Sequence, residues 1–197
     1  MTRGGIDALK EQLWAEAMRQ GLGRAKEVLI VADGAIWIWN LAGDRFAGAR
    51  QRVDFYHVSQ HLWAVAHRLH PDDAAAKAWV QPLLHKLKQD SSCEVITELD
   101  QLAQRLEGPV GEQVEKEVNY LQTHRDRLDY GTARQRDEPL GSGAMESTCR
   151  QSQTRFKRTG QFWSQTGDQA LMCLETFRRN ERWHILFPHS KSDPSKN

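Results

Sequence analysis

The sequence has few cysteines and no long apolar run, and both shortages limit what the protein can be. Its three cysteines, Cys93, Cys149 and Cys173, are widely spaced and form no CxxC pair, which argues against a disulfide framework and against a zinc ribbon. No apolar run approaches the ~18 residues that a membrane span needs. The first residues include Arg3 and Asp7 and have no apolar signal region. We therefore expect a cytoplasmic protein that does not contact a membrane.

An excess of charge of one sign is also missing. The chain has 27 basic and 26 acidic residues, so its global charge neither indicates nor excludes a polyanionic partner. With 197 residues, of which 39% are hydrophobic, it is long enough for one domain with a core and too short for two full-sized domains. Local clusters of charge must therefore indicate whether nucleic acid is a partner.

An apolar stretch from Val28 to Asn40 contains the clearest structural signal. Val28 to Ala32 is apolar, rich in β-branched residues and without polar alternation, which is typical of a strand covered on both faces in an α/β fold. The run ends at Asp33, and the carboxyl end of such a strand is where ligands and metals usually bind. Gly34 then allows a sharp turn. The alternative is that Asp33 only caps the following helix.

The remaining pattern is mostly helical. Residues 6–22 form an amphipathic pattern, 35–41 predict a short helix, and 51–55 predict a second strand that carries Asp54. A parallel βαβ step would bring Asp54 close to the sheet end that carries Asp33. The following segments predict an antiparallel helical bundle, in which Pro82 could kink or split one helix: 58–69, 72–89, 92–107 and 110–127.

A glycine-rich entry marks the return from this bundle. A polar loop at 129–139 leads to Gly141-Ser-Gly143, and a helix is expected from Ala144 to Lys157. Glu146 therefore falls near the first turn of that helix. A last helix is expected at 167–183, and the polar tail to residue 197 has the composition of a disordered segment.

Three acidic residues lie at the ends of predicted elements: Asp33, Asp54 and Glu146. Mg²⁺ prefers oxygen ligands and keeps several waters, so a two-metal site needs carboxylates that converge from different elements. Rigid strand and helix ends can position them. The alternative is that all three are caps or surface carboxylates, which 26 acidic residues would also supply by chance.

Two histidines, His57 and His61, are four residues apart on a predicted helix, a spacing that can bind zinc. The glutamate that a zinc-protease motif places beside the first histidine is missing here. We therefore expect one of the two histidines to face the core or to orient a neighbouring carboxylate.

A basic cluster surrounds the predicted helix of Glu146. Arginine and lysine side chains beside aromatic ones are an electrostatic footprint for a phosphate backbone, with stacking platforms for unpaired bases. A solvated helix face is the alternative. We expect DNA binding by Arg150, Arg155, Lys157, Arg158 and Trp163, in a cluster that also contains Arg134, Arg136, Phe156 and Phe162.

Four motifs, in this order, resemble the C-terminal portion of bacterial insertion-sequence transposases of the ISKra type. The resemblance covers residues 25–187. The motifs are Asp33-Gly-Ala-Ile-Trp-Ile-Trp-Asn40, then Val53-Asp54-Phe-Tyr-His57 with His61-Leu62, then Gly141-Ser-Gly-Ala-Met-Glu146-Ser, and then Arg155-Phe-Lys-Arg-Thr-Gly-Gln-Phe-Trp163-Ser.

The resemblance implies a DDE transposase, related to the Mutator-like group, whose ribonuclease H-like core is interrupted by a helical insertion. The fold would then be α/β but mostly α, with few strands. Residues 1–57 and 140–187 would form a partial core, 58–139 the insertion, and 188–197 a disordered tail. Asp33 and Glu146 would be catalytic and bind two Mg²⁺ ions, while Asp54 and His57 would match a D-x-x-H signature that supports the site.

The sequence departs from this family at one point. The family's first catalytic aspartate lies upstream in a Val-Asp-Gly context, and nothing between Met1 and Val28 matches it. We therefore expect a truncated transposase that is inactive alone for lack of one metal ligand. Two alternatives stay open: a non-catalytic DNA-binding or regulatory fragment that joins an intact transposase or self-associates, and a helical scaffold whose acidic residues only cap helices.

Overall fold

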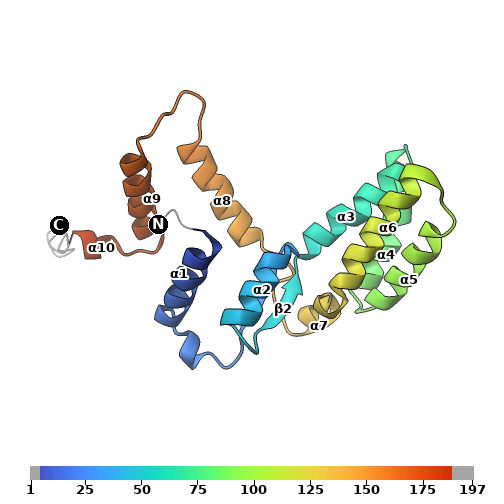
Figure 1. Ribbon diagram of the computed structural model, residues 1–197, viewed down its shortest axis with the longest axis horizontal. Coiled ribbons are helices and arrows are strands. Elements are labelled where there is room, and N and C mark those ends of the chain that lie inside the picture. Colours follow the sequence, from blue (N-terminus) through green and yellow to red (C-terminus); the bar gives the residue numbers. More distant parts are fainter. Residues whose placement is uncertain (1–4, 188–197) are drawn as a thin grey trace, which may run out of the picture. The chain divides into compact units, whose positions relative to one another are not determined.

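A computed structural model describes residues 5–187, so the expected disorder of 188–197 lies outside the described residues. The fold is mostly helical with a two-stranded parallel sheet (Figure 1). The elements are α1 (Ile6–Arg19), η1 (Leu22–Arg24), β1 (Leu29–Ala32), α2 (Ile36–Arg45), β2 (Arg50–Val53), α3 (Phe55–Leu69), α4 (Asp73–Leu87), α5 (Ser92–Ala103), α6 (Gly108–Thr123), η2 (Arg125–Arg127), α7 (Tyr130–Gln135), α8 (Gly143–Phe156), α9 (Gln165–Arg179) and α10 (Trp183–Leu186).

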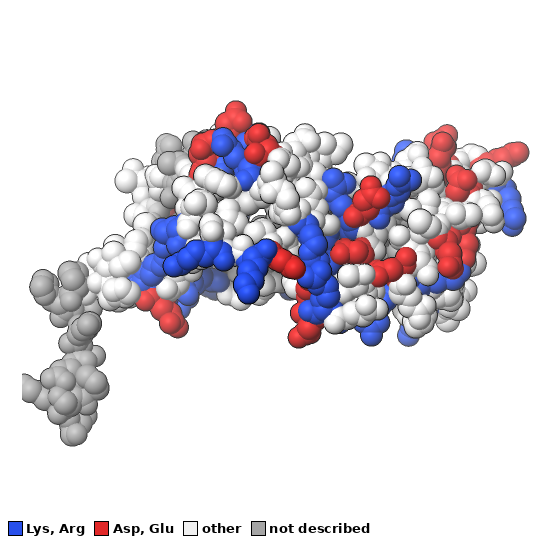
Figure 2. All heavy atoms as spheres, turned by 90° about the horizontal axis from the view of Figure 1, so that it is seen from below, with Lys and Arg blue, Asp and Glu red and all other residues white. Residues whose placement is uncertain are grey.

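The described chain forms two compact units. The first unit is Lys10–Ala144, and the second combines residues 5–9 with 145–187. The first unit therefore contains the sheet and the helical bundle, while most of α8, α9 and α10 belong to the second unit. Acidic and basic side chains are interspersed on the molecular face in Figure 2, in keeping with the near-neutral composition.

The sheet has the βαβ connection that the sequence predicts. β1 and β2 are parallel, with Leu29 opposite Arg50 and Ala32 opposite Val53, and α2 connects them. The Asp54 N–H donates to the Ala32 carbonyl over 2.7 Å. Asp33 and Asp54 therefore follow the last residues of two neighbouring strands at the same end of the sheet.

The prediction that β1 is covered on both faces is wrong. All four residues of Leu29–Ala32 are partly exposed. Successive side chains of a strand point to opposite faces, and only Ile30 and Ala32 pack against the hydrophobic core. The neighbouring strand β2 instead buries a charged residue, because Arg52 is fully inaccessible to solvent.

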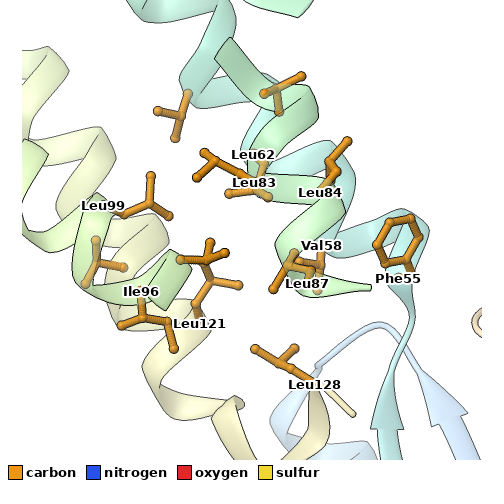
Figure 3. Packing of buried hydrophobic residues seen from close by; sticks show 14 of the residues in the cluster. Phe55, Val58, Leu62, Leu83, Leu84, Leu87, Ile96, Leu99, Leu121 and Leu128 are labelled. Atoms are coloured by element: carbon orange, nitrogen blue, oxygen red, sulfur yellow. The ribbon is translucent and has the colours of Figure 1, made fainter. Parts of the chain in front are cut away.

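Helices α3 to α6 form the bundle that contains most of the core (Figure 3). On α3, Val58, Leu62 and Val65 recur every three or four residues, so they share one buried stripe. The bundle core also contains Val80, Leu83, Leu84, Leu87, Val95, Ile96, Leu99, Val114, Val118 and Leu121.

Pro82 does not split the helix in which it lies. α4 runs from Asp73 to Leu87 through this proline, whose side chain is exposed. A proline removes one backbone donor and crowds the preceding turn. The burial of Leu83 and Leu87 on the core-facing side of the helix holds α4 against the bundle despite that cost.

The segment expected as a polar loop contains a short helix, α7 (Tyr130–Gln135). The Asp90 carboxylate accepts hydrogen bonds from the backbone N–H groups of Gly131 and Thr132, over 2.6 and 2.7 Å. Tyr130 is fully buried, and its hydroxyl donates to the Val53 carbonyl over 3.0 Å. The cap therefore comes from a residue about forty positions earlier, which a local sequence pattern does not reveal.

The helices formed by residues 5–187 offer no candidate for a membrane span, since none combines the required length with sufficient apolar character.

In the second unit, α8 and α9 are joined by Glu175, a buried carboxylate that accepts hydrogen bonds from Arg178 and Arg179 and lies 3.7 Å from Arg155. The hydrogen bonds from Arg178 and Arg179 lower the pKa of Glu175 to about 2.

Candidate functional site

Asp33 lies on the turn between β1 and α2 and is exposed. One oxygen of its carboxylate accepts a hydrogen bond from the backbone N–H of Ala35 over 3.1 Å. The N-cap residue of α2 is Ala35, with no side-chain cap, so Asp33 is not the N-cap residue that the alternative interpretation required. Its second oxygen accepts no hydrogen bond from the described residues, and it is therefore open to a ligand.

Tyr120 of α6 fixes the turn that follows Asp33. Its hydroxyl donates to the Asp33 carbonyl over 3.2 Å. Gly34 has φ +86°, and a Cβ built there would lie 2.5 Å from that hydroxyl, so only glycine fits this close approach. Burial raises the pKa of Tyr120, and the charges of Asp33 and Glu117 add to the effect. The phenol therefore stays protonated as a donor.

Asp54 is almost fully buried and uses both carboxylate oxygens. Its Oδ1 caps α3 by accepting from the backbone N–H groups of Tyr56 and His57, over 2.7 and 3.2 Å. Its Oδ2 accepts from the backbone N–H and the hydroxyl of Ser142, over 2.5 and 2.6 Å. Four hydrogen bonds saturate a carboxylate, so Asp54 has no lone pair left for a metal ion.

Opposing effects act on the acidity of Asp54. Burial acts to raise the pKa of its carboxyl, but the hydrogen bonds from Ser142, His57 and Tyr56 outweigh it and hold the pKa below its usual value. The group is therefore ionised at neutral pH, as an acceptor of four donors must be. Gly141 packs closely beside it, because a Cβ there would lie 3.1 Å from Asp54 Oδ1 and 2.6 Å from the Tyr56 ring.

A buried arginine holds the chain ahead of Ser142 against β2. Arg52 donates twice to the Asp129 carboxylate, both over 2.8 Å, and also to Glu138 over 2.9 Å and to the Pro139 carbonyl over 3.1 Å. A buried charge requires such partners. Hydrogen bonds from Arg50 and Arg52 lower the pKa of Glu138 to about 2. Residues 138–142 are therefore attached to β2 and to Asp54.

The two histidines of α3 lie beside this site. The Nε2 atoms of His57 and His61 are 3.2 Å apart, and His61 Nδ1 lies 2.5 Å from Glu117 Oε2. The Tyr120 ring stacks on His61 with centroids 4.2 Å apart. His61 is thus paired with a neighbouring carboxylate, one of the two outcomes expected for this pair. Among residues 5–187, no three His, Cys, Asp or Glu side chains are grouped to hold a metal ion.

Glu146 is exposed and lies in the first turn of α8. It belongs to the second unit, whereas Asp33, Asp54 and His57 belong to the first. The structure therefore brings Asp33, Asp54 and His57 together at one sheet end, and the pairing of Asp33 with Glu146 stays a prediction. Asp33 and Glu146 are each an exposed carboxylate, which suits Mg²⁺. Asp54 is buried and saturated by hydrogen bonds, so it does not suit a metal ion.

The expected basic cluster is divided between the two units. Arg136 is paired with Glu27 and with Glu138 in the first unit, which neutralises its charge. The second unit contains Arg150, Lys157 and Arg158 as exposed side chains. It also contains the expected DNA contacts Arg155, which lies 3.7 Å from Glu175, and Trp163, whose indole N–H donates to the Phe156 carbonyl over 3.1 Å.

Sequence reasoning missed Arg52, Glu117 and Tyr120. Their partners are distant in the chain, as Tyr120 and Asp33 are 87 positions apart. Of the three, only Arg52 could have been recognised in the sequence. An arginine within the short strand Arg50–Val53 requires a buried partner when that strand is covered. Glu117 and Tyr120 resemble the other polar residues on the face of an amphipathic helix.

No family model matches the sequence, and neither the curated proteins nor the solved structures include a match. The resemblance to ISKra-type transposases consequently depends on the four motifs themselves.

Proposed function

We propose that this chain is a fragment of a DDE transposase, whose full-length relatives cleave DNA and join its strands in a metal-dependent reaction. The main support is the Asp54 carboxylate. It joins the sheet end beside Asp33 to Ser142, and Ser142 lies four residues before Glu146 in the sequence. A buried carboxylate that fixes this segment of the chain beside the open carboxylate of Asp33 suits a site at this end of the sheet.

In this proposal Asp33 and Glu146 hold the magnesium ions. Two Mg²⁺ ions, when bound, supply activation of the attacking oxygen and stabilisation of the leaving oxygen. The other residues of this chain position the two ligands. Tyr120 fixes the backbone of Asp33, and Asp54 fixes α3 and Ser142. His57 is held by His61, which Glu117 orients.

We further propose that the chain has no cleavage or strand-transfer activity alone. Asp54 is saturated by hydrogen bonds, so Asp33 is the one open carboxylate that the described strand ends provide. The test is incubation of the purified chain with end-labelled duplex DNA and Mg²⁺. No product is expected. Magnesium-dependent cleavage that Asp33→Ala abolishes would contradict the proposed inactivity.

We propose DNA as the partner of this protein and the cytoplasm as the compartment in which the protein is found. Lys157 and Arg158 are exposed and lie in a segment rich in basic residues, so they would contact phosphates. Removing phosphate contacts weakens binding and reduces its dependence on salt. Fluorescence anisotropy with labelled duplex should show weaker binding by Lys157→Ala/Arg158→Ala. The control Arg68→Ala/Lys77→Ala removes the same charge from exposed positions of α3 and α4 and should bind as the unaltered chain does.

A second candidate function is that of a non-catalytic DNA-binding or regulatory fragment, which joins an intact transposase or a second copy. The saturation of Asp54 favours it, because this part of the site has a structural role that needs no metal. Salt-sensitive DNA binding that is equal with Mg²⁺ and with EDTA would favour this candidate.

A further inference from the structure

The loop between α8 and α9 presents one aromatic side chain to solvent almost completely. Phe162 is 94% exposed, although burial of a phenylalanine side chain favours folding. Its neighbour Trp163 is 43% exposed. A single exposed apolar residue is ordinary on a protein surface, so Phe162 is distinguished only by the way the loop holds it and by the charges around it.

The loop has several hydrogen bonds of its own. The Gln161 N–H donates to the Arg158 carbonyl over 3.0 Å, and Gly160 has φ +82°. The Trp163 indole N–H donates to the carbonyl of Phe156, at the end of α8, over 3.1 Å. Ser164 then caps α9 by accepting from the Gly167 N–H over 3.0 Å. Phe162 is therefore held outward between two anchored neighbours.

The charges around this loop have one sign. From Ser147 to Gly167 the chain contains Arg150, Arg155, Lys157 and Arg158 and no acidic residue. Arg155 is balanced in part by Glu175, whereas Arg150, Lys157 and Arg158 are exposed. A partner that suits this surface has a dense negative charge and a flat apolar group. A nucleic acid with an accessible base has both features.

We propose that Phe162 stacks on an unpaired or extruded base of bound DNA, with Trp163 as its anchored support. This inference rests on the proposed DNA binding and specifies the form of DNA that the loop prefers. Stacked bases in a duplex leave no free face, so the aromatic ring contributes only where a base is unpaired. The chain is then expected to bind DNA with a bulged base more tightly than an intact duplex.

The experiment uses the full chain and two DNA probes, an intact duplex and the same duplex with a bulged 2-aminopurine. Base–aromatic stacking predicts a loss of about tenfold or more in affinity for the bulged probe in Phe162→Ala, with little change for the duplex. Phe162→Trp should restore both affinity and 2-aminopurine quenching. The matched control is Phe187→Ala, which removes another exposed phenylalanine of the same unit and should change neither.

Three results would overturn the inference. If the unaltered chain binds the duplex, and Phe162→Ala binds each probe as tightly as the unaltered chain does, the stacking role is wrong while the proposed DNA binding stands. If the chain binds neither probe, both proposals fail. If Phe162→Ala instead reduces binding to anionic phospholipid vesicles and leaves DNA binding unchanged, the loop is a membrane contact. A circular dichroism spectrum of each variant should match that of the unaltered chain, because Phe162 contributes little to packing.

Discussion

Ser142 donates both its backbone N–H and its hydroxyl to one carboxylate oxygen of Asp54, over 2.5 and 2.6 Å. The other oxygen caps α3. One buried carboxylate therefore joins the end of β2, the start of α3 and the segment that leads into α8. We expect both stability and the geometry around Asp33 to depend on this contact.

Replacing Asp54 with alanine should destabilise the protein more than the loss of an ordinary helix cap. The variant loses a cap, worth about 1 kcal/mol, and leaves the partly buried donors of Ser142 without their acceptor, which adds about 1–3 kcal/mol. Chemical denaturation should show a loss of roughly 2–4 kcal/mol. Asp72→Ala is the matched control, because Asp72 caps α4 through one exposed hydrogen bond, and it should cost only about 1 kcal/mol. Equal losses would contradict the role given to Ser142.

Gly34→Ala should destabilise the turn after β1 and disturb Tyr120. The new Cβ would meet the Tyr120 hydroxyl at a positive φ, and a strained left-handed residue alone costs about 1–2 kcal/mol. Thermal unfolding should show a lower midpoint. In Gly34→Ala/Tyr120→Phe the hydroxyl is absent, so the combined loss should be smaller than the sum of the two single losses.

Gly43→Ala is the control for that experiment. Gly43 lies inside α2, is exposed, and a Cβ there meets nothing within 4 Å. Alanine is favoured over glycine in a helix by about 0.8–1 kcal/mol, so this variant should be more stable than the unaltered chain. A similar destabilisation at both glycines would indicate that Tyr120 is not the cause at Gly34.

Acid should weaken the attachment of residues 138–142. The pKa of Glu138 falls from an ordinary 4.5 to about 2 through its hydrogen bonds to Arg50 and Arg52, and the pKa of Asp54 is also lowered. A group with a lowered folded pKa contributes stability that is complete above its unfolded pKa. This contribution should be present above pH 4.5 and be lost as the pH falls towards 2. In urea unfolding between pH 3 and 7, the free energy of unfolding should decrease as the pH falls. Glu138→Gln should reduce this dependence on pH.

The sequence predicts the features of the site that depend on local order. The strand before Asp33, the parallel step to Asp54 and the helix that begins just before Glu146 follow from apolar runs and glycine positions, and the structure contains all three. The features it does not predict join distant segments. Tyr120 reaches Asp33 across 87 residues, and Asp90 caps α7 across about forty. The burial of Arg52 depends in the same way on Asp129 and Glu138.

The partial exposure of β1 has a physical cause that composition could not reveal. Four apolar residues in a row indicate a strand, but the number of elements that cover it depends on the rest of the sheet. Here the described sheet has two strands. All four residues of β1 therefore remain partly accessible although their side chains are apolar.

The most direct test of the central claim is a distance measurement between Asp33 and Glu146. Carboxylates that bind two Mg²⁺ ions lie within about 8 Å of each other, because the ions are ~4 Å apart and each Mg–O bond is ~2 Å. In a chain with Cys93, Cys149 and Cys173 changed to serine, the pair Asp33→Cys and Glu146→Cys should be linked within the chain by a short bis-maleimide. Mass spectrometry of the digested product identifies the linked peptides.

A positive control pair, Lys86→Cys and Glu98→Cys, replaces two side chains that form an ion pair in the bundle, and each single-cysteine variant should give no intrachain link. A link between positions 33 and 146 is the result that the proposal predicts. Efficient linking of the control pair with none between positions 33 and 146, in the presence and in the absence of DNA, would contradict a shared metal site.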